Sequence, residues 1–168
     1  KAFIDFINQS EYSFIWQEVA NYLNLKHGQT ISVINAPDQP LDKIKIKGYY
    51  NRLDAWLVIS ALQKITNQPL EKLIELMNDF PGLQRRMEQI TPNLYSDYAH
   101  TPEKIRGCMS VALELAKENN QNVVVVYEPL TNRRQHFMIN DYKDCFNGAS
   151  KVYWIPSYLA REDPNQRI

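Results

Sequence analysis

The sequence is poor in glycine, and it has no long apolar run. Its five glycines are widely spaced, so neither GxxxxGK[ST] nor GxGxxG occurs and no glycine loop can cradle a phosphate group. The apolar runs fall short of the roughly 18–20 residues that a membrane-spanning helix needs, which excludes that class. The first residues also lack the apolar core and the cleavage site of a signal peptide, so we expect no secretory leader.

Cysteine is scarcer still, and the chain carries no excess of either sign of charge. Cys108 and Cys145 are too few for a disulfide framework, which favours a reducing, cytoplasmic setting with buried thiols. Nineteen basic and nineteen acidic residues cancel, so there is no electrostatic reason to expect a nucleic acid or an anionic membrane as partner. A chain of 168 residues with 44% apolar content is long enough for one globular domain or for parts of two.

The first half of the chain predicts a hairpin and helices. Residues 29–48 indicate a β-hairpin, because lysine alternates with isoleucine over 43–47 and leaves one face wet and one face buried. Apolar residues at helical spacing indicate three helices. These are expected over about 11–24 after Ser10, over about 52–66 after Asn51, and from Pro69 onward.

The second half predicts an α/β fold. Extended stretches lie within 86–98, a helix follows from Thr101 to about 118, and a second helix is expected near 137–146. The run Val123–Val126 indicates a strand buried on both faces, and 151–155 indicates another strand. The order β-α-β-α-β is typical of a doubly wound, mainly parallel, Rossmann-like sheet.

Two polar clusters stand where a strand is expected to end and a helix to begin. The first is Ser96–Pro102 (SDYAHTP), and the second is Glu128–His136 (EPLTNRRQH). Ligands bind at the carboxyl edge of such sheets, so Asp97, Tyr98 and His100 are candidates for holding a charged small molecule. An arginine in the second cluster could clamp a carboxylate.

A purely structural interpretation of the first cluster is also open. Asp97 and Thr101 could cap the helix while His100 packs against it. The pair Arg85-Arg86, near the expected boundary at 81–91, could solvate a linker or could contact a phosphate or ribose. The histidines and cysteines show no metal-ligand spacing, so we expect no metal site within this chain.

Three segments together resemble the Mur ligases, which add amino acids to UDP-N-acetylmuramate in peptidoglycan synthesis. Ser96–Pro102 is similar to the family's DYAH[HT]P segment, which opens its C-terminal domain. Gly82–Glu88 (GLQRRME) is similar to its G-x-x-x-R-[FM]-E junction. Gly48–Ala55 (GYYNRLDA) is similar to its G-x-H-N-x-x-N-A segment. The resemblance implies that 1–82 form the C-terminal portion of the central ATPase domain and that 83–168 open the amino-acid-binding C-terminal domain.

The resemblance also implies an activity and residue roles. Family members use ATP and Mg²⁺ to form an acyl phosphate on a carboxylate, which the incoming amine then attacks. Arg86 matches an arginine that contacts the nucleotide, and Asn51 and Asp54 match the adenine pocket. Asp97 and His100, as catalytic residues, would face the γ-phosphate and the incoming amino acid together with Tyr98. Arg134 matches an arginine that holds the amino acid's carboxylate.

The branch of the family is less sharply indicated. Tyr158–Glu162 (YLARE) resembles the L-alanine-adding branch, whose substrates are UDP-N-acetylmuramate and L-alanine, whereas Glu128–Asn132 resembles the E-P-x-[ST]-N of the murein tripeptide ligases of peptidoglycan recycling. Tyr50 and Asp54 replace a family histidine and asparagine, which also leaves a non-catalytic Mur-like binding module open. The phosphate loop and metal ligands are absent, so the chain is expected to be an inactive part of a larger ligase. Its open sheet edge makes a homodimer possible.

Overall fold

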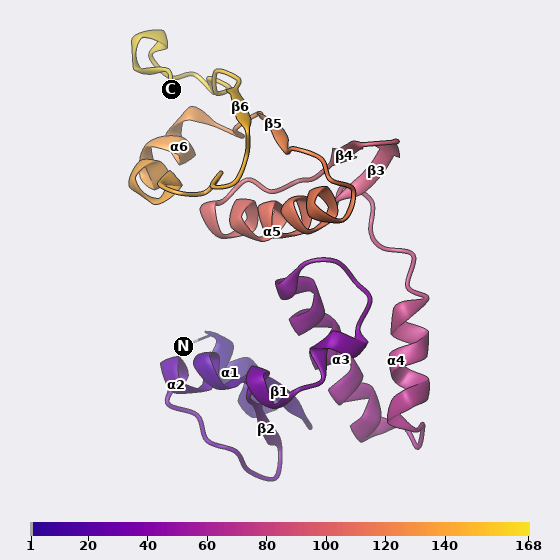
Figure 1. Ribbon diagram of the computed structural model, residues 1–168. Coiled ribbons are helices and arrows are strands. Elements are labelled where there is room, and N and C mark those ends of the chain that lie inside the picture. The colour runs from indigo at the N-terminus through magenta and orange to yellow at the C-terminus, as the bar shows by residue number, and fades with distance from the viewer. Residues whose placement is uncertain (1) are drawn as a thin grey trace. The chain divides into compact units, whose positions relative to one another are not determined.

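Short strands and longer helices alternate in the computed structural model, which describes residues 2–168 (Figure 1). The chain divides into two units. The first comprises residues 1–46 and 50–80, and the second comprises 47–49 and 81–168. None of the helices in 2–168 combines the length and the apolar character that crossing a bilayer requires.

The first unit pairs two short parallel strands and packs them with helices. Strand β1 (Ser13–Trp16) lies parallel to β2 (Ile31–Ile34), in a register that sets Ile15 opposite Val33. In the core, buried residues of the third and fourth helices pack against Ile44, because each of these helices presents an apolar stripe at 3.6-residue spacing. The helices of this unit are α1 (Ala2–Gln9), α2 (Gln17–Leu23), α3 (Tyr49–Ile65), whose first residue belongs to the second unit, and α4 (Leu70–Asn78).

The expected hairpin over 29–48 is wrong. Its first strand exists as β2, but β2 pairs with β1 in parallel, and Ser13–Trp16 is a strand where a helix was expected. Two 3-10 turns, Ala36–Asp38 and Leu41–Lys43, follow β2, and residues 44–48, where the second strand was expected, form no strand. Pro37 and Pro40 lie at these turns and end the extended segment after β2, because each lacks a backbone donor that a strand ladder needs.

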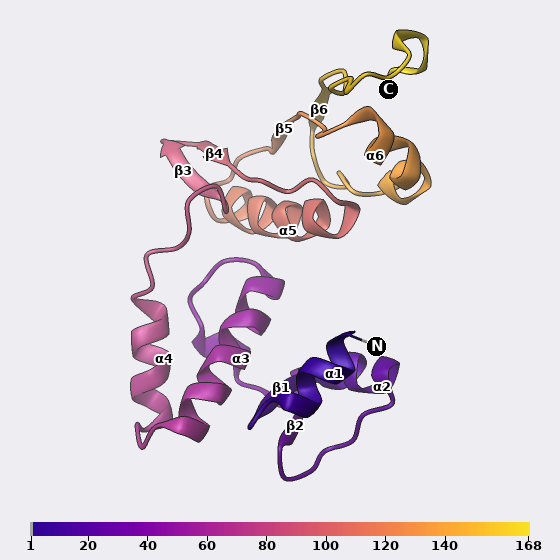
Figure 2. The same ribbon diagram turned by 180° about the vertical axis from the view of Figure 1, so that it is seen from behind.

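The second unit has the predicted mixed α/β character. Strands β3 (Glu88–Thr91) and β4 (Leu94–Ser96) form an antiparallel hairpin, and in both views it lies beside α5 (Pro102–Glu118) (Figure 1 and Figure 2). After strand β5 (Val124–Tyr127) the chain forms α6 (Asn132–Met138) and then β6 (Lys151–Trp154), which pairs with β5 in parallel. The Rossmann-like prediction is confirmed in this parallel β-α-β unit. The helix expected near 137–146 instead begins at Asn132 and passes at Ile139 into a 3-10 turn.

One face of the β5–β6 pair is covered and the other is open. Tyr127 is buried among Tyr142, Phe146 and Trp154. The Trp154 ring meets those of Tyr127 and Tyr142 edge to face, and the Tyr127 and Phe146 rings are tilted. The prediction that the valine run is buried on both faces is wrong, because Val124 and Val126 are 57% and 66% exposed. Within residues 2–168 only the side of the sheet that bears α5 has a covering layer, so alternate valines face outward.

Candidate functional site

The predicted site residues fall into both units. Asn51 and Asp54 lie on α3 in the first unit, so they are described by themselves. Arg86 precedes β3 in the second unit, and Arg134 lies on α6. Asp97, Tyr98 and His100 fall in the segment between β4 and α5, where the sequence places a strand end and a helix start.

The segments 85–87 and 97–100 are bonded to each other, and we call them the junction cluster. Asp97 uses both carboxylate oxygens on backbone donors: Oδ2 accepts from the Met87 N–H at 2.9 Å and Oδ1 from the Ala99 N–H at 2.6 Å. The Tyr98 N–H donates to the Arg85 carbonyl at 3.0 Å. Arg85 and Met87 both have positive φ angles, so these bonds hold a conformation that side-chain-bearing residues rarely adopt.

Cationic and aromatic groups gather round the Tyr98 ring. The Arg85 guanidinium carbon lies 4.5 Å from the ring centroid and that of Arg86 lies 6.0 Å from it. The His100 ring centroid lies 4.9 Å from the same ring. Tyr98 and both arginines are exposed, so the junction cluster presents a positively charged, π-rich surface. Such a surface suits a planar or anionic ligand.

His100 has a defined tautomer. Its Nδ1 lies 2.8 Å from the Tyr98 carbonyl oxygen, and a carbonyl can only accept, so Nδ1 carries the proton. Nε2 of the neutral ring is then an acceptor that can take a proton. Thr101 makes no side-chain bond to the start of α5. The alternative in which Thr101 caps the helix through its hydroxyl is therefore wrong.

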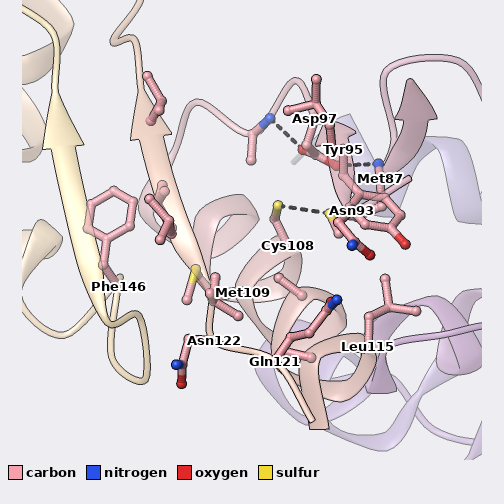
Figure 3. Close-up of a pocket in the computed structure, with 18 of the residues that line it drawn as sticks. Met87, Asn93, Tyr95, Asp97, Cys108, Met109, Leu115, Gln121, Asn122 and Phe146 are labelled. Atoms are coloured by element: carbon pink, nitrogen blue, oxygen red, sulfur yellow. Dashed lines mark hydrogen bonds between the residues drawn. The ribbon is translucent and has the colours of Figure 1, made fainter. Parts of the chain in front are cut away.

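A cavity of about 290 Å³ opens beside the junction cluster, between the β3–β4 hairpin, α5 and β5 (Figure 3). Asp97 and Met87 line it together with Cys108, whose Sγ lies 3.4 Å from the Met87 Sδ. Burial, and secondarily the charge of Asp97, raises the pKa of the Cys108 thiol to about 12. The thiol therefore stays protonated near neutral pH and is a poor nucleophile. Burial also raises the pKa of Cys145.

The second polar cluster surrounds the start of α6. Arg134 is exposed, and within residues 2–168 it makes no hydrogen bond or ion pair, so its guanidinium is available to a ligand. Asn132, by contrast, is 2% exposed and bonded on every side. No sequence signal marks that burial, because asparagine at a helix start is ordinarily a solvated cap.

In the first unit, Asn51 and Asp54 are both exposed along the first turns of α3. Partial burial of its carboxyl by the surrounding chain raises the pKa of Asp54 above the ordinary value. Asn51 lies inside α3 rather than at its N-cap, because the helix begins two residues earlier at Tyr49. In residues 2–168 no three His, Cys, Asp or Glu side chains are grouped so as to hold a metal ion.

Comparison with known proteins gives one consistent set of relatives. The chain is 30% identical over 95 residues to a UDP-N-acetylmuramate–L-alanine ligase of Rickettsia felis, which covers 54% of this chain and 20% of that protein. It is 30% identical over 129 residues to the protein of the same name from Rickettsia canadensis, covering 74% of this chain and 27% of that protein. The chain resembles the Mur ligases. The resemblance predicted from the sequence motifs is confirmed, over about a fifth to a quarter of the relatives' length.

The other comparisons are weaker. No protein-family profile matches the chain. Folylpolyglutamate synthetase of Helicobacter pylori matches 96% of this chain and 42% of its own, at 14% identity and a TM-score of 0.46. That similarity is too distant to indicate a function. It therefore carries no argument about the function of this chain.

Proposed function

We propose that this Mur-ligase-like chain is part of a cytoplasmic, ATP-dependent ligase that joins UDP-N-acetylmuramate to L-alanine in peptidoglycan synthesis. The observation that carries the proposal is the junction cluster. Two segments that resemble separate Mur ligase motifs are hydrogen-bonded to each other and group Arg86, Tyr98 and His100. The ligase name of the Rickettsia relatives supports the same reaction class.

Each residue has a role that its geometry permits. Arg86 contacts the nucleotide, and the exposed Tyr98 ring beside it offers a stacking face to an incoming group. His100, through Nε2, takes a proton from the attacking amine. Arg134, exposed at the start of α6, holds the amino acid's carboxylate. Asn51 and Asp54 belong to the adenine pocket of the same enzyme.

The described residues fit part of a nucleotide site and no metal site. The arginines and Tyr98 suit a nucleotide, whereas no three His, Cys, Asp or Glu side chains in 2–168 are grouped to hold a metal ion, and Asp97 already accepts two backbone bonds. When bound, ATP would supply the phosphoryl group that activates the substrate carboxylate. This chain's contribution is to orient the nucleotide and the amino acid, and catalysis by such means rests on positioning and electrostatics.

The test measures phosphate release from ATP by the intact cellular protein that contains this sequence. Release is expected only when both UDP-N-acetylmuramate and L-alanine are present, and the 168-residue chain alone is expected to release none. Arg86→Ala should lower kcat/KM for ATP by about 100-fold, while the exposed control Lys104→Ala should leave it within about twofold. Phosphate release that ignores the muramate substrate, or turnover by the chain alone, would overturn the proposal.

A second candidate follows from Glu128–Asn132, whose E-P-x-[ST]-N pattern is similar to the murein tripeptide ligases. The same assay separates the two, with the murein tripeptide offered in place of L-alanine. Faster release with the tripeptide would assign the protein to recycling. No release with either, combined with tight binding of the muramate substrate, would favour a non-catalytic binding module.

A further inference from the structure

Asn132 and Ser157 form a buried polar pair at the carboxyl edge of the β5–β6 sheet. They are 2% and 0% exposed, and burying such groups is costly unless every polar atom is bonded. The Asn132 Oδ1 accepts from the Ser157 hydroxyl at 2.7 Å and from the Ile168 N–H at 2.8 Å, while its Nδ2 donates to the Gln166 carbonyl at 3.0 Å. Both polar atoms of the Asn132 side chain therefore have partners, and all of these partners lie in the 157–168 segment. We call these four residues the Asn132 clamp.

The clamp joins three segments that are distant in sequence. Asn132 opens α6, Ser157 follows β6, and Gln166 and Ile168 belong to the last residues of the chain. The Asn132 N–H donates to the Tyr158 carbonyl at 2.9 Å, and Thr131 and Tyr158 continue the parallel pairing of β5 and β6. The Asn132 side chain thus acts together with these backbone bonds to fix where the segment after β6 lies relative to α6.

The start of α6 depends on the clamp because the helix has little else to hold it. It is seven residues long, and Thr131 before it makes no side-chain cap bond. A helix this short is not stable by itself. The Arg133 N–H instead bonds the Glu162 carboxylate at 3.2 Å, and the His136 Nε2 donates to the same Gln166 carbonyl at 2.9 Å. Releasing the clamp would free Glu162 and Gln166, the two residues of the C-terminal segment that make these bonds to α6.

A cavity of about 400 Å³ lies against the clamp, lined by Asn132, Arg133, His136, Phe137, Glu162 and Gln166. Its walls come from α6 and from the segment that the clamp holds. Arg134, which the proposed function assigns to the amino acid's carboxylate, follows Asn132 by two residues on the same helix. The same bonds therefore set where the backbone of Arg134 lies, and with it the region that its guanidinium can reach.

We propose that Asn132 is a positioning residue for the incoming amino acid. It acts through α6 and the 157–168 segment, which it holds together at the carboxyl edge of the sheet, and it need not touch the substrate. The inference rests on the proposed function for the identity of the ligand. It predicts that a change at Asn132 affects binding of the amino acid and not of ATP. The reason is that Arg86 and the junction cluster, which serve the nucleotide, share no hydrogen bond with the clamp in 2–168.

The test compares variants in the intact cellular protein by separate KM values for the amino acid and for ATP. Asn132→Ala should raise the KM for the amino acid about tenfold or more and leave the KM for ATP within about twofold. Ser157→Ala removes the hydroxyl that bonds the Asn132 Oδ1 and the Ile168 carbonyl but leaves the Asn132 side chain in place, so it should give a smaller shift, about threefold. It also serves if Asn132→Ala fails to fold. Asn165→Ala is the matched control, because Asn165 is an exposed asparagine of the same tail whose side chain bonds only Asp163.

Ile105→Val controls for a general loss of stability, since Ile105 is a core residue of α5 outside the clamp. The Ile105→Val variant should lower the fraction of active enzyme and leave both KM values unchanged. Parallel rises in both KM values in Asn132→Ala, or an unchanged KM for the amino acid, would overturn the positioning role. Amide hydrogen exchange on the 168-residue chain adds a readout that needs no turnover, and Asn132→Ala should speed exchange at Ile168. If the wild-type protein shows no amino-acid-dependent phosphate release, the proposed function itself fails. Normal wild-type release with an unshifted KM in the variant overturns this inference alone.

Discussion

Asp97 has a structural role that its position in the segment Ser96–Pro102 does not indicate. Both of its oxygens accept backbone N–H groups, one on each side of the junction cluster. A carboxylate bonded in this way orders the loops on which Arg86 and Tyr98 stand, so its loss would disturb the nucleotide surface through geometry as well as charge.

Replacing Asp97 with asparagine should therefore break one of these two bonds, because the amide nitrogen would face a backbone donor. We expect the free energy of unfolding to fall by about 1–3 kcal/mol and amide exchange to speed up at Met87 or Ala99. Urea denaturation with exchange by NMR measures both. The exposed control Asp141→Asn should change stability by less than about 0.5 kcal/mol, and equal effects of the two variants would contradict the role.

Asp54 gives a prediction in pH. Partial burial raises its pKa from the ordinary 3.8, so the folded chain holds the proton more tightly than the unfolded chain. Stability from this group is then greatest at low pH and is lost as pH rises from 3.8 through the folded pKa. Asp54→Asn should raise Tm at pH 7, by at most about 2 °C because the carboxyl remains partly solvated.

The pH profile separates that effect from others. At a pH well below 3.8 Asp54 is protonated in both states, and the variant and the wild type should melt together. The exposed control Asp42→Asn, whose carboxyl lies in the same unit, should show no rise at pH 7. A lower Tm for Asp54→Asn at pH 7 would show that the charged form is stabilised by a partner instead.

Among the elements, the turn between α6 and β6 packs closely against α5. Gly148 has φ +88°, and a Cβ there would meet the Leu113 side chain at 2.8 Å. Gly148→Ala should therefore lower the free energy of unfolding by about 2–3 kcal/mol, from left-handed strain plus crowding. Gly82→Ala is the matched control, because Gly82 has φ +87° with no atom within 4 Å of the added Cβ.

The control isolates the strain, so Gly82→Ala is expected to lower stability by only about 1–2 kcal/mol. Urea denaturation of the two variants gives the difference directly. Equal losses would mean that Leu113 turns aside freely and that the turn is not tightly packed.

Elements with a strong local signal could be predicted from the sequence, and those decided by pairing could not. The helices α4 and α5 follow from apolar spacing and from Pro69 and Pro102 at their starts. The partner of β2 could not be predicted, since a strand's own residues do not say whether its neighbour runs parallel. The exposure of Val124 and Val126 depends on a covering layer, which the run itself does not encode.

The same distinction applies to the candidate site. Motif matching located Arg86, Asp97 and His100 in the sequence. It did not predict that Asp97 bonds Met87, nor that Arg85 lies nearer the Tyr98 ring than Arg86 does, because both depend on left-handed backbone at 85 and 87. Asn132 was missed since nothing in a local pattern marks a long-range buried bond to Ile168.

In the molecule as a whole, each unit has a hydrophobic core of its own. Ile59 and Trp56 centre the first, and Ile105, Met109 and Tyr127 centre the second. The proposed assignment of these units to the end of an ATPase domain and the start of an amino-acid-binding domain rests on the motifs. Under that assignment the groups that hold the phosphates of ATP belong to neither unit, which fits the lack of a glycine loop.

The mass of the intact cellular protein tests most directly whether this chain is part of a larger ATP-dependent ligase. We expect roughly 475 residues, the length implied by 95 aligned residues making up 20% of the Rickettsia felis relative. Sequencing upstream should reveal a glycine-rich phosphate loop. A native polypeptide that begins near Lys1 and ends near Ile168 would lack any site for the phosphates of ATP and would contradict the ligase assignment.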